Sequence, residues 1–164
     1  MKVLPATSND LSEIMLVIEK AKEIMRLNGN LNQWINGYPS ESVIHEDIEK
    51  NQAFLVVEEN EIRGYFCFVK GIDPEPTYRV IKEGNWLNNA PFGVIHRLAS
   101  DGTIKGIADA CFNFCFNEID NIKVDTHRDN KIMQNYFEKI GFVFCGIINV
   151  SDGSERLAYQ KSIK

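Results

Sequence analysis

The sequence predicts one α/β (α+β) domain over residues 1–164, with a sheet of about seven strands flanked by about four helices. Three observations support this prediction. The chain has 164 residues, near the usual size of one domain, and no repeat or Gly/Pro/Ser-rich linker divides it. Apolar residues make up 44% and charged residues 25%, as in ordinary globular proteins. Strand-like and helix-like segments alternate in β-α-β-α-β order through the second half.

The first part of the chain predicts a strand followed by two helices. A short strand at residues 2–4 precedes the cluster Thr7-Ser8-Asn9-Asp10, whose side chains can cap the free amides of a helix start. Gly29 is the expected end of that helix, and a second helix is expected over residues 42–50. Apolar side chains recur between cap and glycine at the spacing of one buried helix face: Leu11, Ile14, Met15, Ile18, Ala21 and Met25.

The chain then changes to strands and afterwards to alternating elements. Ala53–Glu58 and residues 62–69 are β-rich runs separated by polar residues 59–61, which predicts a hairpin. Prolines at positions 74 and 76 break the chain, because each fixes φ and lacks an amide donor. Beyond them we expect a strand at 93–99, a helix at about 103–116, the strand Asn121–Thr126, a helix at about 131–140 and strands at 142–148 and 156–161.

Charge and composition exclude several classes of function. The 18 Lys and Arg residues are outnumbered by 23 Asp and Glu, giving a net charge of −5, so general attraction to nucleic-acid phosphates is not expected. No stretch approaches the roughly 18 consecutive apolar residues of a membrane span, and the first residues show no secretory signal. The four cysteines lie in apolar settings, so we expect free thiols and a cytoplasmic protein: Cys67, Cys111, Cys115 and Cys145.

The most informative motif is a strand that runs through a polar turn into a helix, at residues 94–108. The first amides of a helix lack internal partners, and the helix dipole attracts anions to that end. Gly106 has no Cβ to obstruct a phosphate, and Ala108 keeps the neighbouring face small. The glycines of this turn can equally serve only to shape a β-α connection, and both interpretations are open at this point. The turn matches neither the P-loop nor the dinucleotide-binding fingerprint.

Two motifs together resemble the GNAT superfamily of acyl-CoA-dependent N-acyltransferases. Thr103-Ile104-Lys105-Gly106-Ile107-Ala108 is similar to the family's Arg/Gln-x-x-Gly-x-Gly/Ala turn, with Thr in the first position. Asn130 and the later run Tyr136-Phe137-Glu138-Lys139-Ile140-Gly141-Phe142 resemble the family's Asn-x-x-Ala-x-x-Leu-Tyr-x-Lys-x-Gly-Phe signature. The resemblance covers the chain from about residue 53 to its end. It implies a central mixed, mostly antiparallel sheet and transfer of an acetyl group from acetyl-CoA.

The resemblance also implies which residues hold the coenzyme. The pyrophosphate is expected on the amides of residues 103–108, and Asn130 is expected to contact the coenzyme arm, although capping of the last helix would explain Asn130 equally well. No metal is expected, because Cys111 and Cys115 on one helix among phenylalanines are explained by core packing. The full set of expected acetyl-CoA contacts is Leu98, Ser100, Thr103, Lys105, Gly106, Ile107, Ala108, Asn130 and Phe137.

Two residues are candidates for proton transfer. His96 lies in the strand before the turn, and a neutral imidazole can take a proton from an ammonium near neutral pH, although a structural histidine is an equally open explanation. The family's acid is a tyrosine four residues before the helix-ending glycine, and that place is taken by Phe137. Tyr136 is the adjacent candidate, but one helical step turns a side chain by about 100°, and core packing also explains it.

The acceptor is expected to be a primary amine of a small molecule or a peptide, attacking acetyl-CoA directly in a ternary complex. Trp34 and Tyr38 follow the first helix, where the resemblance places the segment that faces the substrate. Trp34 can alternatively cover the core. A non-catalytic module that binds or senses acyl-CoA is the alternative function, and a homodimer is an alternative to a monomer.

Overall fold

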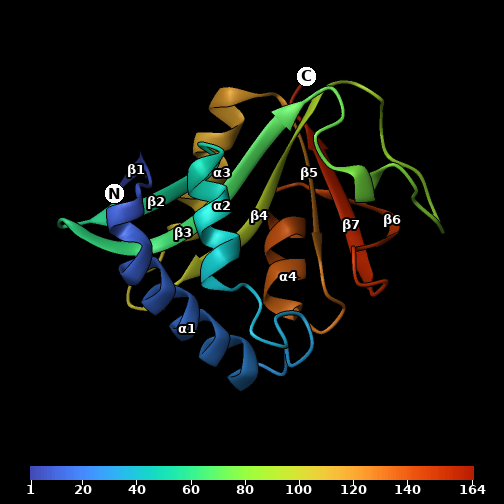
Figure 1. Ribbon diagram of the computed structural model, residues 1–164. Coiled ribbons are helices and arrows are strands. Elements are labelled where there is room, and N and C mark those ends of the chain that lie inside the picture. Colours follow the sequence, from blue (N-terminus) through green and yellow to red (C-terminus); the bar gives the residue numbers. More distant parts are fainter.

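The computed structural model describes residues 1–164 as one seven-stranded sheet covered by helices on both faces (Figure 1). The strands are β1 (Lys2–Pro5), β2 (Ala53–Glu58), β3 (Glu61–Gly71), β4 (Phe92–Ser100), β5 (Asn121–Thr126), β6 (Val143–Asn149) and β7 (Glu155–Ser162). The helices are α1 (Leu11–Leu27), α2 (Glu41–Glu49), α3 (Ile107–Glu118) and α4 (Lys131–Lys139), with short 3-10 turns at Ser8–Asp10 and Pro76–Tyr78. No helix has the length and apolar character that crossing a membrane requires.

The sheet is mixed and mostly antiparallel, as the resemblance to the GNAT superfamily implied. Its strand order is β1-β2-β3-β4-β5-β7-β6, and β4 with β5 is the parallel pair. The two strands pair at only two positions, Gly93 with Ile122 and Val94 with Lys123. Beyond this point β4 stays bonded to β3 up to Ser100, and β5 stays bonded to β7 up to Thr126. The sheet therefore opens between β4 and β5 while its two halves stay intact.

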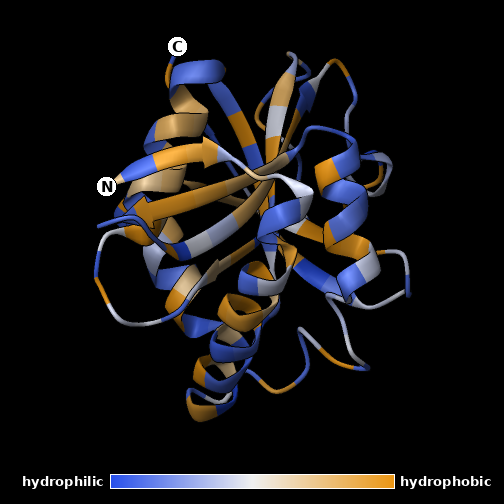
Figure 2. Cartoon of the chain, turned by 60° about the vertical axis from the view of Figure 1, so that its left-hand side comes forward, coloured by the Kyte–Doolittle hydropathy of each residue, from blue (hydrophilic) through white to orange (hydrophobic).

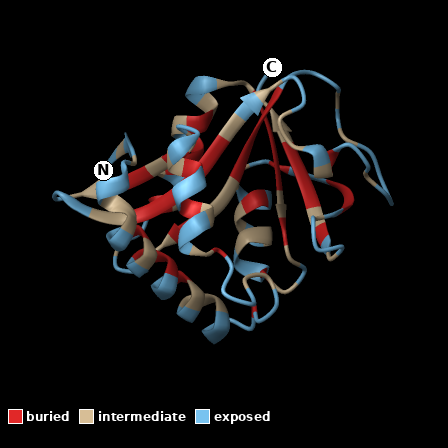
Figure 3. Cartoon of the chain, in the orientation of Figure 1, coloured by how far each residue is buried: buried red, intermediate tan, exposed pale blue.

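Alternating side chains send the two faces of the sheet into different cores. Leu55 and Tyr65 pack with α1 and α2, whereas their neighbours Val56 and Phe66 pack with α3 and Phe137 of α4. Successive strand residues point to opposite faces, so α1 and α2 cover one face and α3 and α4 the other. Apolar stripes of the helices turn toward the sheet in Figure 2, and buried residues concentrate in the strands in Figure 3.

The predicted β2–β3 hairpin is confirmed. Glu58 pairs with Glu61, so only Glu59 and Asn60 make the turn. Both turn residues have positive φ (52° and 63°), as a two-residue hairpin turn of the I′ type requires. The hairpin leads β3 back beside β2, and β3 then supports β4, the strand that carries the functional site.

The predicted start of the third helix at residue 103 is wrong, because α3 begins at Ile107. Gly106 stands before it with φ at +95°, which a residue inside a helix cannot adopt. Thr103 is held in the turn instead, where its backbone N–H and its hydroxyl both donate to Asp101 Oδ1, at 3.0 and 2.6 Å. The turn between β4 and α3 is therefore longer than the spacing of apolar residues indicated, and α3 begins later.

A bulge in β4 changes the direction of its side chains. Tyr65 pairs with Ala99 and Cys67 with His96, so Arg97 and a second β4 residue share the single position opposite Phe66. Arg97 has φ at +54°, the left-handed conformation that is uncommon outside glycine. A bulge of this kind places consecutive side chains on one face, and here it turns both His96 and Arg97 toward the face that α2 covers.

We predict that Gly64 of β3 is required for α3 to approach the sheet. A Cβ at Gly64 would stand 2.5 Å from Ile107 Cγ2, at the first residue of α3. Gly64→Ala should lower the free energy of unfolding by about 1–3 kcal/mol, the usual cost of overpacking. Urea unfolding measures the effect. Gly71→Ala is the matched control on the same strand, since nothing lies within 4 Å of its added Cβ. Equal stability of the two variants would contradict this packing.

Candidate active site

A groove opens between β4 and β5 beyond the positions where they pair. It encloses about 390 Å³ and is lined by both strands, by the C-terminal part of α1 and by the starts of α3 and α4. Apolar side chains make much of its wall, among them Leu98, Val124, Met133 and Phe137. An elongated, partly apolar ligand with a few polar groups fits a groove of this kind.

The start of α3 forms one end of this groove. Gly106, Ile107 and Ala108 line it, so the free amides and the positive end of the helix dipole face the ligand space. A Cβ at Gly106 would have only Met1 Cε within 4 Å, at 3.6 Å, which leaves the backbone open to an anion. Lys131, at the start of α4, adds a basic side chain to the lining.

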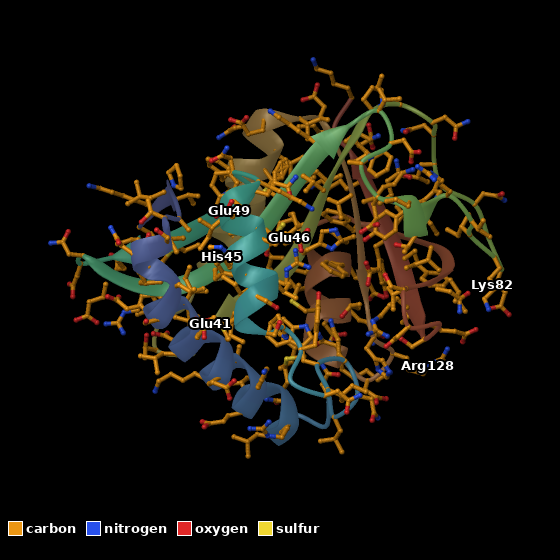
Figure 4. The ribbon with its side chains drawn as sticks, viewed as in Figure 1. Glu41, His45, Glu46, Glu49, Lys82 and Arg128 are labelled. Atoms are coloured by element: carbon orange, nitrogen blue, oxygen red, sulfur yellow. The ribbon has the colours of Figure 1, made fainter.

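A second cavity of about 660 Å³ lies on the face of the sheet that α2 covers. Its walls come from α2, β3, β4, the segment around Glu75 and the loop after β6. Figure 4 shows the acidic side chains of α2, including Glu46, which lines this cavity. Five residues line both cavities and so mark their junction: Gln33, Trp34, Ile95, Arg97 and Asp125. Ligands in the two cavities can therefore meet at this junction.

His96 faces the second cavity together with a carboxylate partner. Its Nε2 lies 3.0 Å from Oε1 of Glu75, and both side chains are largely but not fully buried. Burial alone would raise the pKa of Glu75, but the hydrogen bond and charge of His96 lower it below its ordinary value. An imidazole oriented by a carboxylate and open to a cavity can accept a proton from a ligand.

Arg97 is held in a buried network rather than left free for a ligand. Its Nη2 and Nε donate to the two oxygens of Asp47, at 2.6 and 2.8 Å, and its Nη1 donates to the Tyr38 hydroxyl at 3.0 Å. Asp47 Oδ2 also accepts from the Tyr65 hydroxyl at 2.7 Å. Removing one member of such a network leaves a buried charge without its partner, so Arg97 fixes the wall of the junction.

Asp125 lies at the junction without a cationic partner. Its Oδ2 accepts a hydrogen bond of 2.5 Å from the Tyr78 hydroxyl. Burial raises the pKa of Asp125, and the bond from Tyr78, with the charges of His96 and Arg156, offsets only part of this effect. Tyr78 and Glu75 belong to the same short segment, so one stretch of chain orients both carboxylate sites of the second cavity.

The remaining charges around the second cavity are mostly paired. Lys50 contacts Glu46 at 2.7 Å on α2. Lys82 and Arg128, labelled in Figure 4, lie outside the cavity lining, and both contact Glu155, at 2.7 and 3.1 Å. Five carboxylates line the cavity against three Lys and Arg side chains, which gives it a negative character suited to a cationic ligand. The carboxylates are those of Glu46, Asp47, Glu75, Asp125 and Asp152, and the cations are Lys50, Arg97 and Arg156.

Comparison with solved structures identifies the family. An acetyltransferase of the GNAT family from Streptococcus agalactiae matches with a TM-score of 0.88 and 30% sequence identity, over 99% of this chain and 95% of the other. The chain belongs to the GNAT family. It is an acyltransferase, with the seven-stranded fold of that family.

More distant GNAT structures share the fold. A GNAT-family acetyltransferase from Listeria monocytogenes matches with a TM-score of 0.70 and 18% identity, over 99% of this chain and 94% of the other. The ribosomal-protein-S18-alanine N-acetyltransferase of Escherichia coli matches with a TM-score of 0.65 and 12% identity, over 99% and 94% of the two chains. No family model matches the sequence, and no curated protein matches it.

Most of the residues expected to contact acetyl-CoA line the groove of this GNAT protein. The expected residues found in its wall are Leu98, Ser100, Gly106, Ile107, Ala108, Asn130 and Phe137. Asn130 also caps α4, because its Oδ1 accepts from the Met133 amide at 3.1 Å. Thr103 and Lys105 are exposed and lie outside the lining.

The expected catalytic and acceptor-binding residues separate in space. His96 and Tyr38 line the second cavity, and Trp34 lies at the junction. Tyr136 lines neither cavity, and its hydroxyl donates to Asp109 Oδ1 at 2.7 Å. Phe137 is buried in the groove wall, at the place where the resemblance puts the family's acid.

Sequence reasoning missed four residues that shape the site. They are Gln33, Glu75, Asp125 and Lys131. Glu75 sits between two prolines, which predict only a break in the chain. Asp125 did offer a signal in the sequence, because it is a carboxylate next to the end of an otherwise β-rich run. A charged residue in such a run is a candidate for a functional site.

All four cysteines are buried free thiols. Cys111 and Cys115 are fully buried in the core under α3, which confirms the packing interpretation. Cys67 borders the second cavity, but burial raises its pKa to about 12, which keeps it a neutral thiol. No three His, Cys, Asp or Glu side chains gather as metal ligands would.

We predict that Asp125→Asn stabilises the protein at pH 7. A raised pKa in the folded state means that stability falls as the pH rises from the ordinary aspartate value, near 3.9, through the raised one. Asparagine removes that loss and keeps an oxygen for the Tyr78 hydroxyl. The gain should be largest above the raised pKa and should shrink as the pH falls toward 3.9.

Urea unfolding at a series of pH values measures this effect. Asp120→Asn is the control, since Asp120 pairs with Lys164 at the surface, 3.0 Å away, and its loss should change stability little at any pH. An Asp125→Asn protein that is less stable than the wild type at pH 7 would show that the charged form of Asp125 is favoured by the fold.

Proposed function

We propose that this protein transfers the acetyl group of acetyl-CoA to a primary amine by direct attack in a ternary complex. The observation that carries the proposal is the junction of two cavities at the break between β4 and β5. One cavity has the length and the helix start that suit a coenzyme, and the other has the carboxylates that suit an ammonium. A ternary mechanism needs both ligands to be present at once with their reacting ends in contact.

The coenzyme lies in the groove in this proposal. Its pyrophosphate accepts hydrogen bonds from the amides at the start of α3, beside Gly106, and the dipole of α3 adds to the attraction. The pantetheine arm passes between Leu98 of β4 and Phe137 of α4, which both line the groove. The thioester then reaches the junction marked by Ile95 and Asp125.

The acceptor enters the second cavity as an ammonium, drawn by Glu75 and Asp125. His96 accepts one proton from it, and the neutral nitrogen attacks the thioester carbonyl carbon. The new C–N bond forms, the C–S bond breaks, and the coenzyme leaves as a thiolate. A second N–H proton is released to solvent as the amide forms, and the thiolate takes up a proton from solvent.

Departure of the thiolate proceeds without a tyrosine acid in this scheme. Tyr136 donates to Asp109 and lies outside both cavities, while Phe137 carries no proton to give. A CoA thiol is acidic enough to leave unaided. The absence of a tyrosine acid is also compatible with the second candidate function, a module that binds or senses acyl-CoA without turnover.

An acceptor screen separates the two functions. Acetyl-CoA is mixed with amino acids, polyamines, aminoglycosides and peptides with free N-termini, and release of free CoA thiol is followed. Amine-dependent release supports transfer, and binding of acetyl-CoA without any release supports sensing. The unpaired cysteines and the net charge of −5 support action in a reducing cytoplasm on a substrate other than nucleic acid.

Gly106→Val should weaken acetyl-CoA binding at least tenfold, because the added side chain stands where the pyrophosphate approaches the amides. Calorimetry with acetyl-CoA measures the change. Gly153→Val is the matched control for backbone strain, since its φ of +86° is similar to the +95° of Gly106 and nothing lies within 4 Å of its added Cβ. Unchanged affinity for acetyl-CoA in a folded Gly106→Val protein would show that the pyrophosphate does not bind at Gly106.

His96→Gln should lower kcat/KM by roughly 10²-fold or more, because glutamine can bond to Glu75 but cannot carry a proton. Steady-state kinetics with an amine accepted in the screen measures the change. Tyr136→Phe is the control and should keep most of the activity. A His96→Gln enzyme with the wild-type kcat/KM would leave His96 a purely structural role.

A further inference from the structure

Gln33, in the loop between α1 and α2, is held by an unusual set of hydrogen bonds. Its Oε1 accepts from Asn130 Nδ2 at 3.0 Å and from Asn30 Nδ2 at 3.1 Å, with longer contacts from Thr126 Oγ1 at 3.3 Å and the His127 amide at 3.4 Å. The donors come from α1's end, β5's end and α4's start. One oxygen therefore fixes the loop against three other parts of the chain.

The orientation of this amide is fixed by its partners. The His127 backbone N–H can only donate, so the atom of Gln33 that faces it must be the oxygen. Asn130 Oδ1 accepts from the Met133 amide, so Asn130 must present its nitrogen to Gln33. Both constraints place Gln33 Nε2 on the other side of the amide group.

Gln33 Nε2 makes no hydrogen bond within the chain, and it is not among the buried atoms that lack a partner. Its residue lines both cavities at the junction. The loop is further held by Asn32 Nδ2, which donates to Asp129 at 3.2 Å, and by Arg156, which donates to the Gln33 carbonyl at 3.4 Å. The result is a pair of N–H donors held in place before any ligand arrives.

We propose that Gln33 Nε2 donates a hydrogen bond to the acyl carbonyl oxygen of the bound thioester. This inference rests on the proposed function. Attack of the amine turns that carbonyl oxygen into an oxyanion, and the C–S bond then breaks as the carbonyl reforms. A donor already held at the place where charge develops stabilises it without reorganisation at the moment of reaction.

Gln33→Glu isolates the donor from the structural role. A carboxylate oxygen can still accept from Asn30 and Asn130, so the loop should stay in place, but the second oxygen offers no proton to the thioester. We expect kcat to fall about a hundredfold or more. Thermal unfolding should be close to that of the wild type.

Binding measurements supply a readout that needs no acceptor. By calorimetry, Gln33→Glu should weaken acetyl-CoA binding while leaving the binding of free CoA, which lacks the acyl group, unchanged. Gln134→Glu is the matched control: Gln134 Nε2 donates to the carbonyls of His127 and Arg128 in the same region and lines neither cavity. Gln33→Leu, which also removes the acceptor, should lose stability in addition.

The outcomes are distinct. Equal loss of CoA and acetyl-CoA affinity in Gln33→Glu, with kcat retained, would assign the donor to an amide carbonyl of the pantetheine arm and overturn the proposal. Wild-type kcat and affinities in Gln33→Glu would overturn it as well. Failure of the wild-type protein to bind acetyl-CoA would instead reject the proposed function on which it rests.

Discussion

The separation of β4 from β5 is the constraint on which the rest of the structure depends. Parallel strands that stayed paired along their whole length would close the sheet and leave no space through it. Here they pair only at Gly93 and Val94 of β4, and each then follows its outer neighbour. The stability of the sheet is kept by the antiparallel pairs on either side, so the opening costs only the ladder between two strands. Both cavities meet in this opening.

The bulge in β4 decides what faces the opening. Regular alternation would send His96 and Arg97 to opposite faces of the sheet. With the bulge both reach the face beneath α2, where they take different roles. Arg97 donates two hydrogen bonds to Asp47, and these bonds fix α2 to the sheet. His96 instead faces the second cavity, beside Glu75. One backbone irregularity thus supplies both a rigid wall and a titratable group.

The junction of the two cavities holds a carboxylate, Asp125, whose charged form does not favour the fold. Asp125 has a raised pKa because burial outweighs the Tyr78 hydrogen bond and the charges of His96 and Arg156. Stability alone would favour a neutral residue in this position. Glu75 differs, because His96 lowers its pKa and makes it a stable orienting group. The two carboxylates of the second cavity therefore contribute in different ways.

The sequence by itself determined the order of the elements and the turn before α3 where we propose that the pyrophosphate binds. Apolar spacing located the helices and strands, because periodic burial is a local property, and Gly106 marked the turn because only glycine accepts its φ readily. Tertiary structure alone decided the insertion of β7 between β5 and β6, and the meeting of Gln33, Glu75 and Asp125 around His96 and Arg97. These residues lie far apart in the chain, and nothing local records that strand pairing and a bulge bring them together, since long-range pairing is set by the packing of the whole sheet.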